Sequence, residues 1–304
     1  MEPHERRGSI LGSLLAQREW LLLDGIRDRL IVPDDVAAEI WNVEFPGRIN
    51  AQHLAGIEAG ADIILTNTFG GNAIHLRSHE AQGRVRELNL AGAEIARNLA
   101  DRAERKLAVA GMIGPATGDL SPAEAMDFSL TIEIFHEQAD ALKEGGADIL
   151  WFDGITAPAG IEVAAAVARL TGLDWAGTMY PVAAGLGELL KSLPEYPAAF
   201  GVHSESGPSD AMRLLLKLRA ENIACPLIAH ARLDQPAADG GNMGLVADYG
   251  LMARDAGARI IGGRGMALAH LSAMQDALGA RPRNRPPSEA DIEKVLGAVS
   301  AGSG

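Results

Sequence analysis

The chain has 304 residues, of which 47% are hydrophobic and 22% are charged, so it can bury one large core. Its formal net charge of −13 disfavours binding to nucleic acids and to anionic membrane surfaces. No stretch is apolar over the length of a membrane span and the first residues lack the apolar core of a signal peptide, so we expect a cytoplasmic protein. The single cysteine, Cys225, excludes an intrachain disulfide and a zinc site built from several cysteines of one chain.

Short strand-like runs recur along the chain, and longer stretches with helical spacing separate them. Nearly continuous apolar strands that alternate with helices predict a parallel sheet covered by helices. Eight such units favour an α/β fold, a closed (β/α)8 TIM barrel, as one domain over residues 1–304 with its core at about 20–281. The runs are WLLLD (20–24), DIILT (62–66), KLAVAG (106–111), DILWFD (148–153), WAGTM (175–179), AAFGV (198–202), PLIAH (226–230) and RIIGG (259–263).

Four of these runs are preceded by segments of similar wording. They are EAGAD (58–62), EGGAD (144–148), LTGLD (170–174) and DAGAR (255–259). We expect a glycine in each segment to take the left-handed conformation after a helix and to turn the chain into the next strand. The repeated turn supports the barrel.

Polar residues at the carboxyl ends of the predicted strands are the candidates for function, because active sites of such barrels lie there. A strand-end aspartate can also simply cap the following helix. We expect three catalytic residues, His203, His230 and Asp153. The imidazoles of the two histidines can exchange protons near neutral pH. The expected substrate-binding residues are Asp24, Asn67, Thr68, Thr178, Ser204, Glu205 and Arg264.

Two alternatives concern the same region. His203 and His230 end neighbouring strands, and with Asp153 or Glu205 they could bind a metal ion. Histidines without a motif spacing are a weak signal, so we expect hydrogen-bonded polar residues and no metal. The segment GGRG (262–265) could bind phosphate through its backbone amides and Arg264, although a glycine turn with an exposed arginine explains it equally well.

Several longer stretches carry a family resemblance. They are ILTNTFGGN (64–72), AGMIGPATGDL (110–120), FHEQADALKEGGADILWFD (135–153) and ARDAGARIIGG (253–263). In order, spacing and wording they resemble the homocysteine S-methyltransferase family, especially bacterial members similar to betaine–homocysteine methyltransferase. The resemblance extends from about Trp20 to Arg281 and implies a (β/α)8 barrel that transfers a methyl group to a thiol.

The resemblance also implies a zinc site that this chain lacks. Family members bind zinc through a cysteine in G-x-N-C after strand six and a cysteine pair in G-G-C-C-G after strand eight, and the ion keeps homocysteine as a thiolate. Here GVHS (201–204) places Ser204 at the first position and GGRG (262–265) places Arg264 at the pair. A hydroxyl is a poor zinc ligand, and two like unit charges about 4 Å apart repel by roughly 4 kcal/mol at an effective dielectric constant near 20. We therefore expect no zinc and no other cofactor.

Two loops also differ from the family pattern. GTMYPVAAG (177–185) is shorter than the corresponding loop of bacterial relatives, and HARLDQP (230–236) replaces an N-A-G-x-P motif. We predict a divergent family member, a zinc-independent methyltransferase or related enzyme for a small carboxylate or betaine-like molecule, rather than a zinc-dependent homocysteine methyltransferase. The alternative is a catalytically silent paralogue that binds a small-molecule ligand, as a homo-oligomer or in a hetero-oligomer with an active methyltransferase subunit.

Overall fold

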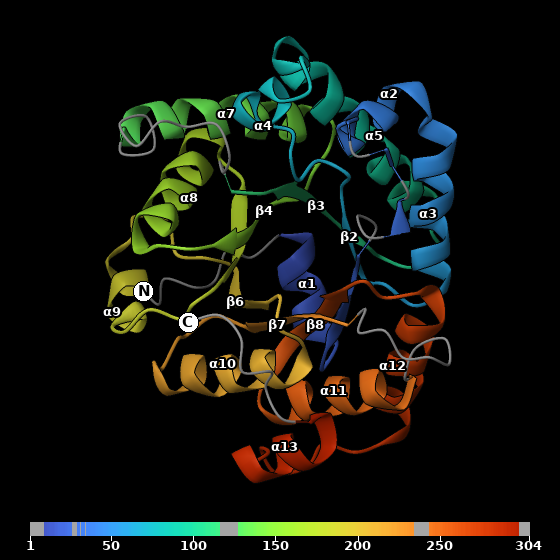
Figure 1. The fold of residues 1–304 in the computed structure, drawn as a ribbon, viewed down its shortest axis with the longest axis vertical. Coiled ribbons are helices and arrows are strands. Elements are labelled where there is room, and N and C mark those ends of the chain that lie inside the picture. Colours follow the sequence, from blue (N-terminus) through green and yellow to red (C-terminus); the bar gives the residue numbers. More distant parts are fainter. Residues whose placement is uncertain are drawn as a thin grey trace.

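The computed structural model describes residues 9–25, 29–30, 32–33, 35–115, 127–233 and 243–297. The end of the loop after strand seven, residues 234–236, lies outside them. Eight parallel strands close into a barrel in chain order (Figure 1), which confirms the predicted fold. Each strand overlaps one predicted run: β1 (Leu21–Asp24), β2 (Ile63–Leu65), β3 (Ala108–Ile113), β4 (Ile149–Ile155), β5 (Asp174–Met179), β6 (Ala199–Ser204), β7 (Leu227–Arg232) and β8 (Ala258–Arg264).

Helices surround the strands (Figure 1). Three of the helices, α3, α8 and α10, begin at a proline, which fits the first turn because no backbone N–H is needed there. Among the described residues, no helix combines the length and apolar composition that crossing a membrane requires. The helices are α1 (Ile10–Gln17), η2 (Ala38–Ile40), α2 (Trp41–Glu44), α3 (Pro46–Glu58), α4 (Ala73–Arg77), η3 (Gln82–Arg84), α5 (Val85–Arg102), α7 (Phe128–Glu144), α8 (Pro158–Thr171), α9 (Leu186–Ser192), α10 (Pro208–Ala220), α11 (Met243–Asp255), α12 (Leu268–Ala280) and α13 (Glu289–Leu296).

The strand side chains divide into two buried sets, because successive residues of a strand point to opposite faces. One set packs outward against the helices and includes Leu22, Leu150 and Val202. The alternate residues fill the inside of the barrel, so the lumen is a packed core and not a pore. The inner set consists of Leu21, Leu23, Ile63, Leu65, Ala108, Ala110, Met112, Ile149, Trp151, Ala176, Ala199, Ile228 and Ile260, together with Leu11 and Leu14 of α1.

The helix α1 covers the N-terminal end of the barrel. Its Leu11 and Leu14 pack against the inner core. Arg259, near the start of β8, donates hydrogen bonds to the carbonyl oxygens of Leu15 and Arg18. These contacts hold α1 across the end of the barrel that lies opposite the carboxyl ends of the strands.

Each of the four segments predicted to turn the chain into a strand contains a glycine with a positive φ angle. The angles are 110° at Gly60, 93° at Gly146, 72° at Gly172 and 108° at Gly257. A residue with a side chain rarely adopts this conformation, so the sequence signal and the turn geometry agree.

Candidate active site

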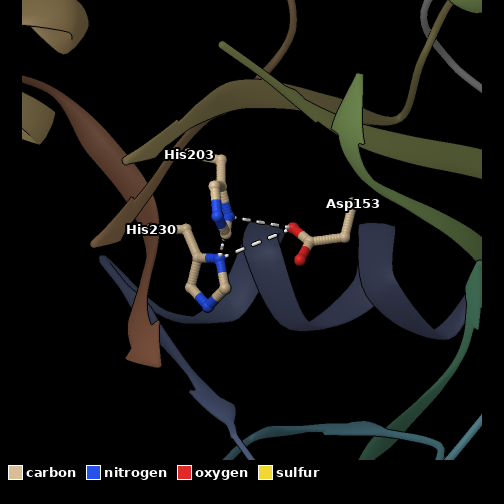
Figure 2. A group of neighbouring side chains, drawn as sticks. All are labelled: Asp153, His203 and His230. Carbon is tan, nitrogen blue, oxygen red and sulfur yellow. Dashed lines mark hydrogen bonds and ion pairs between the residues drawn. The ribbon is translucent and has the colours of Figure 1, made fainter. Parts of the chain in front are cut away.

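Three polar side chains converge at the mouth of the barrel, at the carboxyl ends of β4, β6 and β7 (Figure 2). Each continues the inner side of its strand: Asp153 follows Trp151, His203 follows Ala199 by four residues, and His230 follows Ile228. Strand pairing aligns His203 directly with His230. The period of two along each strand therefore brings all three side chains above the packed lumen.

The three side chains, called the mouth triad below, form a compact group. His203 Nδ1 lies 3.0 Å from His230 Nδ1, and each of these nitrogens lies 3.5 Å from Asp153 Oδ1. Asp153, His203 and His230 are only 2%, 6% and 1% exposed. A buried group of this kind has to satisfy its polar atoms internally, because water does not reach it freely.

Thr178 on β5 supports the carboxylate of the mouth triad. Its Oγ1 donates a hydrogen bond of 2.7 Å to Asp153 Oδ1 and accepts one of 3.0 Å from the backbone N–H of Gly154. The threonine is fully buried. Its hydroxyl therefore fixes the orientation of the carboxylate from the neighbouring strand.

A charged rim, formed by Glu205, Arg232 and Arg264, lies one layer further out than the mouth triad. Glu205 Oε1 accepts a hydrogen bond of 2.8 Å from His203 Nε2 and forms an ion pair with Arg264. Arg232 Nη1 lies 3.8 Å from Glu205 Oε2. The charge of Arg264 is therefore balanced locally by Glu205, and the same carboxylate connects the rim to the mouth triad.

The proximity of these groups shifts their pKa values. Burial would raise the pKa of Asp153, but the two imidazoles outweigh it and hold this pKa well below its ordinary value. Burial would lower the pKa of His203, but Asp153 and Glu205 outweigh it and raise this pKa to about 9. The hydrogen bond from His203, opposed by burial and aided by Arg264, lowers the pKa of Glu205 to about 2. The cluster thus holds its carboxylates as anions.

Gly201, one layer below the histidines, and Gly262, aligned with His230, let the strands and the inner core approach closely. A Cβ atom on Gly201 would lie 2.1 Å from the backbone oxygen of Ile228 on β7, and one on Gly262 would lie 2.6 Å from Cβ of Leu23. Both distances are far below van der Waals contact. The layer that carries the mouth triad therefore requires glycine at these positions.

Two of the predicted substrate-binding residues point away from the mouth. Asp24 is fully buried on the outer side of β1, where it accepts a 2.9 Å hydrogen bond from His53 of α3 and pairs with Arg29. Ser204 faces the start of α10, where its hydroxyl donates a 2.7 Å hydrogen bond to Asp210. Both residues belong to networks other than that of the mouth triad.

Asn67 and Thr68 lie in the segment after β2 and bind backbone groups. Asn67 donates a hydrogen bond of 2.8 Å to the carbonyl oxygen of Ala38, and Thr68 donates one of 2.7 Å to that of Met112. These bonds attach the segment to η2 and β3. The predicted residues that come together at the mouth are Asp153, Thr178, His203, Glu205, His230 and Arg264.

Arg232 is a rim residue that the sequence predictions did not include. It lies two residues after His230 and is aligned with Arg264 by strand pairing. The signal that could have found it is the period of two, since His230 and Arg232 share one side of β7. On β7 the prediction stopped at His230, the end of the apolar run, and so it included Glu205 and Arg264 of the rim but not Arg232.

The residues at the two positions to which the resemblance assigns zinc-binding cysteines do not fit a zinc ion held by thiolates. Ser204 uses its hydroxyl on Asp210, and Arg264 is paired with Glu205. Cys225 precedes β7 and therefore lies at the opposite end of the barrel, where burial raises its pKa to about 12. Such a thiol stays protonated near neutral pH, and its position keeps it apart from the carboxyl ends of the strands.

A separate cavity of about 780 Å³ lies at that opposite end, between α1 and the segments that precede β6 and β7. Its lining includes Gly12, Tyr196 and Cys225. It contains none of the converging side chains of the mouth. We place the candidate site at the mouth because catalysis requires charged and ionisable side chains in mutual contact, and the large cavity at the opposite end does not contain the mouth triad.

Comparison with known proteins gives a family and a fold. The family model described as homocysteine S-methyltransferase matches residues 12–278. Crystal structures of the homocysteine methyltransferase MmuM from Escherichia coli, in its oxidized and metallated forms, each have a TM-score of 0.72 and 22% sequence identity, and cover 88% of this chain and 99% of that one. At this level of identity the likeness shows the same fold.

Curated relatives match a shorter part of the chain. Methionine synthase from Mycobacterium tuberculosis is 35% identical over 115 residues, and that from Mycobacterium leprae is 34% identical over 113. These matches cover 37% and 36% of this chain but only 10% and 9% of the synthases. Since the family model covers nearly the whole barrel, this chain belongs to the homocysteine S-methyltransferase family.

Proposed function

We propose that this chain is a methyltransferase, or a related enzyme, that acts at the barrel mouth without a cysteine-held zinc ion. Its substrate in this proposal is a small carboxylate or betaine-like molecule. Family membership supports the reaction class. The observation that carries the proposal is the contact of the mouth triad with a charged rim through Glu205.

The two layers have different roles in this proposal. The mouth triad contacts the reacting group, where imidazoles can donate or accept a proton. The rim provides two guanidinium groups, Arg232 and Arg264, near the single carboxylate of Glu205. A guanidinium binds a carboxylate through paired hydrogen bonds, so an anionic substrate fits this rim better than a cationic one does.

A substrate panel tests the proposal. The full chain is incubated with betaine and sulfonium methyl donors and with carboxylate and thiol acceptors, and products are detected by mass spectrometry. We expect turnover of a carboxylate-bearing substrate and no conversion of homocysteine to methionine. Zinc-dependent methionine formation as the main activity would contradict the proposal.

Arg264→Ala provides the residue-level test. Removing this guanidinium should raise the KM for the carboxylate substrate by about tenfold or more, which corresponds to roughly 1.4 kcal/mol. Arg86→Ala is the matched control, because Arg86 also pairs with a glutamate, Glu144, but on the exposed surface between α5 and α7. An equal effect of both variants on KM would count against a substrate role for Arg264.

The replaced cysteine positions favour a second candidate function, that of a silent paralogue. In that case the chain binds a ligand at the same mouth or pairs with an active methyltransferase subunit. It would then show no turnover across the panel, and it would co-purify with the active subunit and alter its rate.

The cytoplasmic location and the lack of nucleic-acid and membrane partners, which the composition and net charge favour, also stay predictions.

A further inference from the structure

We infer that Asp153, His203 and His230 together bind one divalent transition-metal ion at the barrel mouth. The inference rests on the proposed site and deepens it, because the mouth triad then holds an ion rather than a proton. It also revises the expectation from the sequence that the chain binds no metal.

The distances within the mouth triad carry the inference. The three ligand atoms are His203 Nδ1, His230 Nδ1 and Asp153 Oδ1, and they are separated by 3.0, 3.5 and 3.5 Å. An ion with bonds of about 2.1 Å separates neighbouring ligand atoms by about 3.0 Å at right angles and about 3.4 Å at tetrahedral angles. The triangle therefore matches one face of a coordination shell.

Hydrogen bonds alone explain this triangle less well. An N–H···O bond usually spans about 2.7–3.2 Å, so the two 3.5 Å separations between Asp153 and the histidines exceed it. Only the separation between the two imidazoles has hydrogen-bond length. A proton joins two of the three atoms, whereas an ion between them would bind all three.

The surrounding hydrogen bonds prepare the ligand atoms. His203 Nε2 lies 2.8 Å from Glu205 Oε1, and donation of its proton there leaves the lone pair of Nδ1 for a metal. Thr178 fixes Asp153 Oδ1 by donating to it. Histidine ligands commonly donate their second N–H to a carboxylate in this way, which sets the tautomer and orients the ring.

The alternation along β6 explains how a metal can bind where the family's first cysteine position holds a serine. Ser204 points outward to Asp210, and its neighbour His203 points into the mouth. Arg264, whose charge suggested that a cation is excluded, is paired with Glu205. Two imidazoles and one carboxylate suit ions such as Zn²⁺, Fe²⁺ or Co²⁺, and three protein ligands leave positions for a substrate.

Cobalt binding tests the inference directly. The full chain is stripped with a chelator, then titrated with Co²⁺ while visible absorption is recorded, and Zn²⁺ is titrated by calorimetry. We expect one ion per chain in both titrations. Asp153→Asn, His203→Gln and His230→Gln should each weaken binding by at least about 100-fold, since even loss of a supporting hydrogen bond costs about 10- to 100-fold.

His79→Gln is the matched control for adventitious binding. His75 and His79 are both half-buried, their rings are tilted by 48° with centroids 5.6 Å apart, and such a pair can bind a metal weakly. This variant should leave the tight site unchanged. Circular dichroism and thermal unfolding establish that each variant is folded, and Glu205→Gln, which keeps all three ligands, should give a smaller loss than the ligand variants.

The inference fails if the stripped chain binds neither Co²⁺ nor Zn²⁺, or if the three ligand variants bind as tightly as the unsubstituted chain. A hydrogen-bonded triad without metal would then be the correct description. The readout is ion binding, so it is independent of turnover. Tight binding without any turnover would leave the inference standing and would reject the proposed function instead.

Discussion

Thr178 shows how one hydroxyl connects two strands at the candidate site. Its hydroxyl on β5 donates a hydrogen bond to Asp153 of β4 and accepts one from the backbone N–H of the next residue, Gly154. Both partners are held at fixed distances from β5. Because Asp153 is buried, loss of this donor would leave part of a buried charge without its hydrogen bond.

Thr178→Val should therefore destabilise the chain and loosen the mouth triad. A hydrogen bond to a charged group contributes about 1.5–3 kcal/mol, and we expect a loss of that size in the free energy of unfolding. Affinity for Co²⁺ should fall by about 10- to 100-fold. Urea denaturation and cobalt titration measure the two effects.

Thr171→Val is the control for this substitution. Thr171 is also buried, but its hydroxyl donates to the carbonyl oxygen of Val167 within α8, which already belongs to the helix. Its removal should cost about 0.5–1.5 kcal/mol in the free energy of unfolding, the contribution of a hydrogen bond between uncharged groups. A similar loss in both variants would show that Thr178 matters only as a buried threonine.

Individual side chains show how far the sequence can predict a site. His203, His230 and Asp153 could be placed at the mouth because they end apolar runs, and the structure brings them together. Ser204 and Asp24 were placed with them, although they have the opposite parity on their strands and face helices. The parity is visible in the sequence, but the register that makes it decisive comes from strand pairing.

At the scale of elements, the close approach of β6 to β7 positions the two histidines side by side. Gly201 makes this approach possible, since a Cβ there would lie 2.1 Å from the Ile228 backbone oxygen. Backbone atoms cannot move aside as a flexible side chain can. The pairing of His203 with His230 therefore depends on a residue that has no chemistry of its own.

Gly201→Ala should destabilise the barrel by about 1–3 kcal/mol, the usual cost of overpacking a core. It should also weaken Co²⁺ binding, because β6 has to shift relative to β7. Gly279→Ala in α12 is the matched control, as nothing lies within 4 Å of the added Cβ. Alanine there should stabilise the helix by up to about 1 kcal/mol, and urea denaturation distinguishes the two signs.

The strands and the glycine turns, which repeat along the chain, were predicted more reliably than the contacts of the loops between them. The eight apolar runs and the glycines at Gly60, Gly146, Gly172 and Gly257 predicted strands and turns that the structure contains, because burial on both faces and a positive φ restrict the choice of residue. Asn67 and Thr68, whose role in substrate binding stays a prediction, also bond to the backbone of η2 and β3. Such contacts between distant segments leave no periodic pattern in the sequence.

At the scale of the whole molecule, the two ends of the barrel differ in chemistry. The mouth carries ionisable groups, and the opposite end carries α1 and the single cysteine, which is 8% exposed. Burial raises the pKa of Cys225 to about 12, against about 8.5 for a free thiol. The thiol is thus a probe of the end that is remote from the candidate site.

Labelling of Cys225 by a disulfide reagent at pH 8 should be slow in the folded chain and fast in denaturant, because only the thiolate reacts. The raised pKa also means that unfolding releases a proton above pH of about 8.5. Stability should therefore fall as the pH rises from that value toward 12. Labelling of the folded chain as fast as that of the denatured one would contradict the burial of this thiol.

The plug that α1 forms with the filled lumen has a kinetic consequence. Leu11 and Leu14 pack against the inner core and close the N-terminal end of the barrel. Two reactants that meet at the mouth triad must therefore both enter through the mouth. The one that sits deeper has to arrive first and depart last. Initial-rate and product-inhibition studies of any two-reactant chemistry at this barrel should accordingly reveal a compulsory order of arrival.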